Sequence, residues 1–164
     1  MSLTVVFGFV LLELLTVAWI DFKTEKISNK WIFVNTFVAI LLHATARTLY
    51  PLSWEVLIFP VGFIVVGFFL YLLNVMGAGD SKFLASLFLI IPLEFHMPFF
   101  EKLVISSIAV GAILFSYRIY KNGAELKAYF VGHYWEGIRK SLQSRFSYAP
   151  VIFLAWIILG FNIW

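Results

Sequence analysis

The chain has 164 residues, of which 62% are hydrophobic and 13% charged, and its mean hydropathy is +0.95. A soluble domain is nearer half apolar and a quarter charged, so the composition excludes that class and predicts an all-α polytopic membrane protein. The absence of cysteine excludes disulfides, thiolate metal sites and a cysteine nucleophile. The net charge of +3 is modest, and we expect no nucleic-acid partner.

Six apolar runs predict six transmembrane helices within one domain that covers residues 1–164. A span needs about 20 mostly apolar residues. The first run has no basic segment before it and no small-residue cleavage site, so it predicts a retained helix rather than a removable signal. In chain order the expected spans are Leu3–Ile20, Trp31–Ala46, Val56–Met76, Asp80–Leu93 (with an end anywhere before Pro98), Leu103–Tyr120 and Tyr148–Trp164.

The distribution of basic residues predicts the orientation of these spans. If residues 21–30 are cytoplasmic, then residues 76–82 and 121–147 are cytoplasmic as well. Ten of the twelve lysines and arginines lie in these three segments or at their edge, and only Arg47 and Lys102 lie on the other side. Under the positive-inside rule this bias makes the three segments cytoplasmic and both termini non-cytoplasmic.

The segment between the fifth and sixth spans, residues 121–147, is amphipathic. Basic residues lie among apolar residues that recur every four positions, which favours a helix lying in the membrane interface. We interpret the segment as a connector on the membrane surface, and help in docking a substrate is the alternative. The apolar positions are Leu126, Phe130, Tyr134, Ile138, Leu142 and Phe146.

Two acidic residues are expected at the same membrane face. Asp21 follows the first apolar run, and Asp80 precedes the fourth, between Gly79 and Lys82. An ionised carboxylate near hydrocarbon depth is costly, so each is a candidate functional residue. Gly77 and Gly79 permit a backbone turn that a side chain would obstruct. The simpler alternatives are an ordinary interfacial acid for Asp21, a helix cap for Asp80 and a lysine that reaches the headgroups for Lys82.

Two neighbouring carboxylates in a partly desolvated site suit peptide hydrolysis. One stays protonated while the other is charged, so the charged group takes a proton from water and the neutral group donates to the scissile carbonyl. This chemistry needs no nucleophilic side chain, and two aspartates without histidine are a thin metal-ligand set, so we expect neither metal nor cofactor. Glu13 lies about 12 Å deeper than Asp21, and we expect it to be neutral and hydrogen-bonded within the bundle.

Three stretches together resemble one family. Gly77-Ala78-Gly79-Asp80-Ser81-Lys82-Phe83 is similar to the GxGD-x-K signature of the type IV prepilin peptidases, which are membrane aspartic proteases. Asp21 followed by Ile27-Ser28-Asn29-Lys30-Trp31 resembles the D-x5-I-P-N motif of that family, with Ser28 where a proline is usual. Tyr148-Ala149-Pro150 and the apolar residues after it resemble the family's proline-containing final helix. The resemblance covers essentially the whole chain.

The resemblance implies that Asp21 and Asp80 are the catalytic pair, with Gly77, Gly79, Lys82 and Asn29 as substrate-binding or supporting residues. It implies that the chain cleaves the basic leader from prepilins or pseudopilins at the cytoplasmic face of the bacterial inner membrane, beside the lipid bilayer. The length resembles the small peptidases of Flp, or tight-adherence, pilus systems. The paired Cys-x-x-Cys motifs of the bifunctional members are absent, so we expect no N-methyltransferase activity.

Three alternatives remain open at this point. Archaeal preflagellin peptidases use the same pair of aspartates, and presenilin-type proteases share GxGD but are much larger and carry a Pro-Ala-Leu motif that this chain lacks. The alternative from another class is a non-enzymatic component, such as a proton-coupled transporter, with Asp80 and Glu13 as relay groups. A relay would spread its acids through the membrane depth, whereas a catalytic pair would place two at one level.

Overall fold

The computed structural model of the protein describes residues 3–24, 27–73, 76–132, 134 and 148–163. Their regular structure is entirely helical, as the all-α prediction requires. Two short 3-10 turns, η1 (Trp54–Leu57) and η2 (Leu93–Phe95), precede α3 and α5. The six α-helices of the described residues are α1 (Leu3–Thr24), α2 (Asn29–Thr45), α3 (Ile58–Leu72), α4 (Ala78–Ile90), α5 (His96–Val131) and α7 (Ala149–Ile163).

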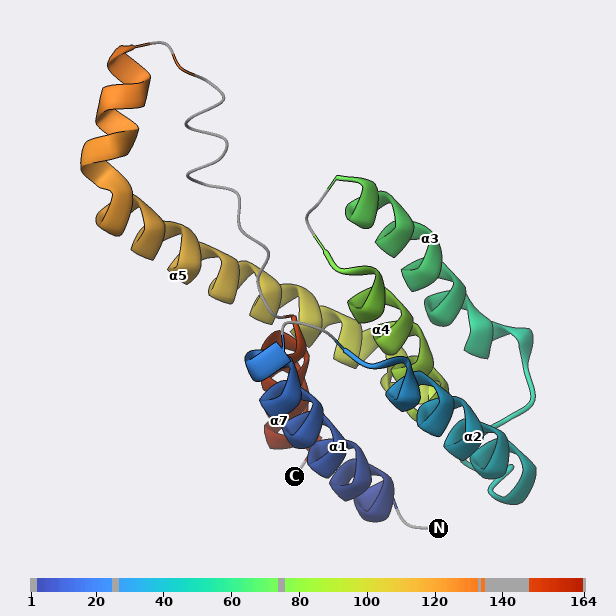
Figure 1. Ribbon diagram of the computed structural model, residues 1–164. Helices are drawn as coiled ribbons and strands as arrows, with labels where there is room; N and C mark the ends of the chain where they lie inside the picture. The colour runs from blue at the N-terminus through green and yellow to red at the C-terminus, as the bar shows by residue number, and fades with distance from the viewer. Residues whose placement is uncertain (1–2, 25–26, 74–75, 133, 135–147, 164) are drawn as a thin grey trace.

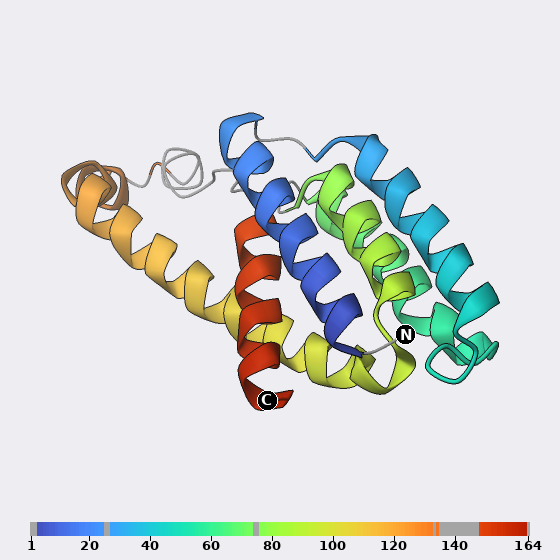
Figure 2. The ribbon, with the colours of Figure 1, turned by 90° about the horizontal axis from the view of Figure 1, so that it is seen from below.

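The helices form a bundle in which α4 packs mainly against α2 and α3, while α7 packs against α1 and α5 (Figure 1). Figure 2 shows that α1 begins and α7 ends at one end of the bundle. The end of α1 and the starts of α4 and α7 lie together at the opposite end. Both predicted acidic positions are therefore carried to the same end of the molecule.

The short helix α4 forms the centre of the core. Nine of its thirteen residues are buried, because apolar or small side chains occupy every position after Lys82. Phe88 illustrates the packing, since its ring stacks on Phe59 of α3 at 5.0 Å and meets Phe99 of α5 at 5.3 Å. A helix that is apolar all round is expected in the interior rather than at a surface.

Three helical segments of the described chain are long and apolar enough to cross a membrane, namely Leu3–Thr24, Trp54–Leu72 and Leu93–Gly123. Large apolar side chains are exposed along them, including Leu12 at 67% and Phe69 at 60%. A soluble protein seldom exposes so much apolar surface, whereas lipid covers it without cost. The helices α2, α4 and α7 have 17, 13 and 15 residues, so six spans remain a prediction.

The boundary between the fourth and fifth helices differs from the prediction. Helix α4 ends at Ile90 because Ile91 is extended, with φ −73° and ψ 129°, as expected for a residue before proline. Helix α5 then starts at His96 rather than at Leu103. Nε2 of His96 lies 2.9 Å from the carbonyl oxygen of Ile91, so the side chain helps to close the turn.

Helix α5 bends at Asn122, whose φ of −105° and ψ of 15° are not helical. Beyond the bend the helix continues to Val131 and points away from the bundle (Figure 1). The start of the predicted amphipathic segment is thus helical, as expected. Residues 133 and 135–147 of that segment lie outside the described residues.

A buried tyrosine ties the loop after α2 to the core. The Tyr50 hydroxyl donates a hydrogen bond of 2.6 Å to the carbonyl oxygen of Ile90, one of the last carbonyls of α4, which have no partner within the helix. Burial raises the pKa of the Tyr50 hydroxyl, so it keeps the proton that it donates. This terminal carbonyl of α4 is therefore satisfied although it lies inside the bundle.

Candidate active site

Asp21 lies in the last turn of α1 and is only 2% exposed. The buried face of α1 includes Val10, Glu13, Val17 and Asp21, whose spacing of three or four residues keeps them on one side of the helix. Oδ2 of Asp21 accepts a hydrogen bond of 3.3 Å from the backbone N–H of Ala149, the first residue of α7. The N-terminus of a helix favours an anion, so α7 supplies a stabilising contact that α1 cannot.

Asp80 is the third residue of α4 and is 8% exposed. Its Oδ2 accepts a hydrogen bond of 3.1 Å from the backbone N–H of Gly77, the residue that caps the helix. The predicted capping role of Asp80 is therefore real, but the carboxylate acts from inside the first turn rather than from the cap position. Both carboxylates thus lie at the N-terminus of a helix.

The carboxylates of Asp21 and Asp80 interact electrostatically with one another. They come from the end of α1 and the start of α4, which lie at the same end of the bundle (Figure 2). The two predicted residues are therefore both buried and lie at the same end of the bundle. Such an arrangement can hold one proton between two acids, which is the chemistry that an acid–base pair requires.

The glycines before Asp80 act through space rather than through an unusual backbone. Gly77 has φ −72° and ψ 144°, a conformation open to any residue, so the predicted special turn is not what requires glycine there. A Cβ on Gly79 would lie 3.1 Å from the carbonyl oxygen of Ile27. The absence of a side chain lets the stretch that follows Asp21 in the sequence approach the start of α4.

A third glycine contributes to the site and was not predicted. A Cβ on Gly67 of α3 would lie only 2.0 Å from Cβ of Ser81, the residue after Asp80. Helices α3 and α4 therefore cross in close contact beside the site. Small residues at helix crossings are common in membrane proteins, and a glycine within the apolar run of α3 was the available signal.

Lys82 and Asn29 lie at the surface rather than among the buried groups of the site. Both are exposed, and among the described residues no hydrogen bond or ion pair joins Lys82 to Asp80. Asn29 is the first residue of α2, where Ser28 accepts a hydrogen bond of 3.4 Å from the backbone N–H of Lys30. The family's usual proline position is thus a helix cap here, and contact of Lys82 or Asn29 with a substrate stays a prediction.

Two hydroxyl groups that were not predicted are hydrogen-bonded to one another, and one of them interacts with the pair. The Tyr148 hydroxyl interacts electrostatically with Asp80, and its oxygen lies 2.5 Å from Oγ of Ser107 on α5. Tyr148 directly precedes Ala149, the residue that donates to Asp21. The Tyr-Ala-Pro sequence before the last apolar run was the only signal, and it does not indicate the distant Ser107.

Glu13 belongs to a separate polar cluster deeper in the bundle. It is 4% exposed and faces the side chain of Asn35, which donates a hydrogen bond of 3.3 Å to Oγ of Ser86. Its burial agrees with the predicted place within the bundle, whereas the predicted hydrogen bond of Glu13 is not formed within the described part of the chain. Neither carboxyl oxygen of Glu13 has a partner at hydrogen-bonding geometry, and the cluster is about two helical turns from Asp21.

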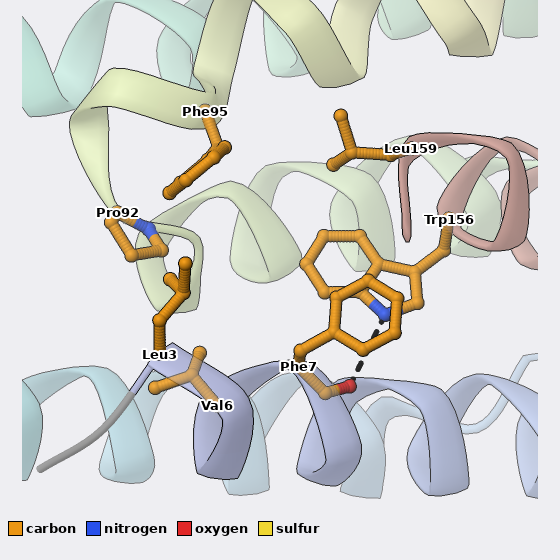
Figure 3. A pocket seen from close by; sticks show the side chains of 7 residues that line it. All are labelled: Leu3, Val6, Phe7, Pro92, Phe95, Trp156 and Leu159. Atoms are coloured by element: carbon orange, nitrogen blue, oxygen red, sulfur yellow. Dashed lines mark hydrogen bonds between the residues drawn. The ribbon is translucent and has the colours of Figure 1, made fainter. Parts of the chain in front are cut away.

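The small apolar cavity of Figure 3 has no part in this site. Its lining joins the start of α1, the turn after α4 and the middle of α7, and Nε1 of Trp156 donates a hydrogen bond of 3.2 Å to the carbonyl oxygen of Phe7. Leu3 and Val6, which line it, belong to the end of α1 that lies away from Asp21 (Figures 2 and 3). We therefore interpret it as a packing gap.

A metal centre has no support in the residues that the structure describes, where no three or more histidine, cysteine, aspartate or glutamate side chains gather closely enough to bind a metal.

Comparison with known proteins adds an independent finding. The sequence profile of the type IV leader peptidase family matches residues 8–164 of the chain. No curated protein and no solved structure matches it.

Proposed function

We propose that this chain, which belongs to the type IV leader peptidase family, is an aspartic endopeptidase with Asp21 and Asp80 as its catalytic pair. The observation that carries the proposal is that two buried carboxylates, each held at a helix N-terminus, lie at the same end of the bundle and interact electrostatically. The family supports a peptidase, and these two groups supply acid–base chemistry at one place.

The proposed reaction is attack of water on the scissile carbonyl. The ionised member of the pair takes a proton from water, whose oxygen bonds to the carbonyl carbon, and the protonated member donates to the carbonyl oxygen. Collapse of this intermediate breaks the C–N bond: the nitrogen takes the proton that came from water, and the other aspartate takes back a proton from a hydroxyl of the intermediate, which leaves a carboxylic acid and restores the pair. Because the two aspartates share one proton, the acid and base roles belong to the pair rather than to one residue.

We propose type IV prepilin-like precursors of the Flp type as the substrates, with cleavage of their basic leader. The apolar helix of such a precursor can stay in the bilayer beside the enzyme while the leader stays outside it, so the scissile bond is held at the depth of the pair. Positioning of this kind lowers a barrier substantially. An archaeal preflagellin precursor would satisfy the same chemistry.

We further propose six membrane spans in the bacterial inner membrane, with both termini outside the cytoplasm. The positive-inside bias supports this orientation, because ten of twelve basic residues fall in or at the edge of the segments on one side. Tagging of each connection for accessibility in intact cells tests it, and labelling of residues 21–30 from the outer face would contradict it.

Co-expression with a Flp-type prepilin, followed by a size-shift assay, tests the function. We expect cleavage by the wild type and a loss of at least about 10³-fold for Asp21→Asn and for Asp80→Asn. Glu13→Gln is the matched control, because it replaces a buried carboxyl group of the same helix as Asp21 and lies outside the pair. Near wild-type cleavage by either asparagine variant would refute the pair, and loss of cleavage in Glu13→Gln alone would place the essential acid outside the pair.

A further inference from the structure

We infer that the Tyr148 hydroxyl is a third functional group of this site, positioned by Ser107 to donate a hydrogen bond to the scissile carbonyl oxygen. The inference rests on the proposed function and names a group that the aspartate pair alone does not supply. As water attacks, negative charge develops on that oxygen, and a fixed donor aimed at it stabilises the transition state more than the ground state.

The backbone of Tyr148 is held firmly at the start of α7. Its carbonyl oxygen accepts hydrogen bonds from the N–H groups of Val151 at 3.0 Å and Ile152 at 3.2 Å. The next N–H along the chain, that of Ala149, binds Asp21 at 3.3 Å. Of two consecutive residues at one helix start, Ala149 therefore binds one aspartate, and the hydroxyl of Tyr148 interacts electrostatically with the other.

The side chain of Tyr148 is held from a different helix. Ser107 Oγ lies 2.5 Å from the Tyr148 oxygen and donates to the carbonyl oxygen of Leu103 at 2.7 Å. A serine hydroxyl has one hydrogen and two acceptor positions. With its hydrogen on Leu103, Ser107 accepts the hydrogen of Tyr148, so the pair of hydroxyls keeps the tyrosine oriented beside Asp80.

A rotation of the Ser107 hydroxyl would release the Tyr148 hydrogen for a substrate. Ser107 would then donate to the Tyr148 oxygen, while Tyr148 donates to the carbonyl oxygen of the bound peptide. Loss of the hydrogen bond from Ser107 Oγ to Leu103 costs little, because the carbonyl oxygen of Leu103 lies four residues before Ser107 and keeps its backbone hydrogen bond within α5. Tyr148 retains its proton throughout, and the proton that reaches the substrate comes from the aspartate pair.

Steady-state kinetics on purified enzyme and a synthetic Flp-type prepilin test the inference. For Tyr148→Phe we expect kcat to fall about 100-fold, the loss typical of one missing oxyanion donor. We expect KM to change by no more than about threefold, because binding of the substrate in its ground state is kept. Ser107→Ala should lower kcat about tenfold, and Ser107→Thr should restore it by retaining the hydroxyl. Tyr71→Phe, an exposed tyrosine on α3, is the matched control.

Wild-type kcat in Tyr148→Phe would overturn the inference and leave the proposed function intact, because the wild type still cleaves. A purely structural role would lower the thermal midpoint of Tyr148→Phe and raise KM without lowering kcat, which would also overturn it. If Tyr148→Phe does not fold, an unchanged kcat in Ser107→Ala would overturn the inference instead. Failure of folded wild-type enzyme to cleave any prepilin would remove the proposed function first and this inference with it.

Discussion

Each carboxylate of the site is held by a backbone N–H of a different helix start. Asp80 uses its own helix α4 through Gly77, whereas Asp21 at the end of α1 uses Ala149 of α7. A negative side chain in the last turn of its own helix faces the unfavourable end of that helix dipole. The contact with α7 therefore offsets a local cost and fixes Asp21 in the site.

Gly79 provides a test at the scale of one residue. A Cβ there would lie 3.1 Å from the carbonyl oxygen of Ile27, so the backbone around Ile27 or the start of α4 must shift. We expect Gly79→Ala to lower the cleavage rate about tenfold through displacement of Asp80. Gly111→Ala is the control, because nothing lies within 4 Å of its Cβ position. Equal cleavage rates for the two alanine variants would show that the close approach of Ile27 to Gly79 does not affect catalysis.

The two aspartates were predictable as candidate functional residues, because an ionised side chain near hydrocarbon depth costs free energy and therefore indicates a function. Tyr148 and Ser107 were not, since 41 residues separate them and hydroxyl residues are common in membrane helices. The contact of Asp21 with Ala149 spans 128 residues, and no local pattern in the sequence records such a pairing. The glycines were found for the wrong reason, because they provide space rather than a special turn.

At the scale of elements, the close crossing of α3 and α4 supports the start of α4. A Cβ on Gly67 would lie 2.0 Å from Cβ of Ser81, so Gly67→Ala must separate the helices beside Asp80. We expect it to destabilise the fold by about 1–3 kcal/mol and to lower cleavage. Thermal unfolding in detergent measures the first effect and the prepilin assay the second.

Gly62→Ala on the same helix is the matched control. Its Cβ position has nothing within 4 Å, so alanine adds only helix propensity and should stabilise α3 by about 0.5–1 kcal/mol. Opposite shifts in the unfolding midpoint for the two variants are expected. A stabilised Gly67→Ala variant would show that α3 and α4 do not cross as described.

Helix existence was predictable from apolar runs, but helix ends were less so. Ile91 is extended before Pro92, so α4 stops at Ile90, and η2 leads directly into α5 at His96. The apolar run itself continues past that point, since lipid-facing and core residues are equally apolar in this chain. A proline inside such a run is the one local signal, and it was compatible with either boundary.

At the scale of the whole molecule, the site joins two groups of helices. Asp80 is on α4, which packs mainly on α2 and α3, and Asp21 is on α1, which packs on α7. Figure 1 shows the two groups side by side, with α5 extending past the site end of the bundle. The candidate site therefore lies at the junction of the two groups.

The composition of the site predicts the response to metal removal. The pair consists of two aspartates, and within the part of the chain that the structure describes no larger cluster of metal-ligating side chains is present. We expect EDTA to leave prepilin cleavage by purified enzyme unchanged. Activity that is lost on chelation and restored by zinc would contradict an aspartic mechanism.

The most direct measurement of the central claim is the cleavage rate of Asp21→Asn, Asp80→Asn and the double variant on one purified prepilin. Residues that act as one catalytic unit are not additive, so removal of both costs about as much as removal of one. The account predicts equal losses of at least about 10³-fold for all three enzymes. Losses that multiply in the double variant, or a single variant that cleaves at the wild-type rate, would contradict it.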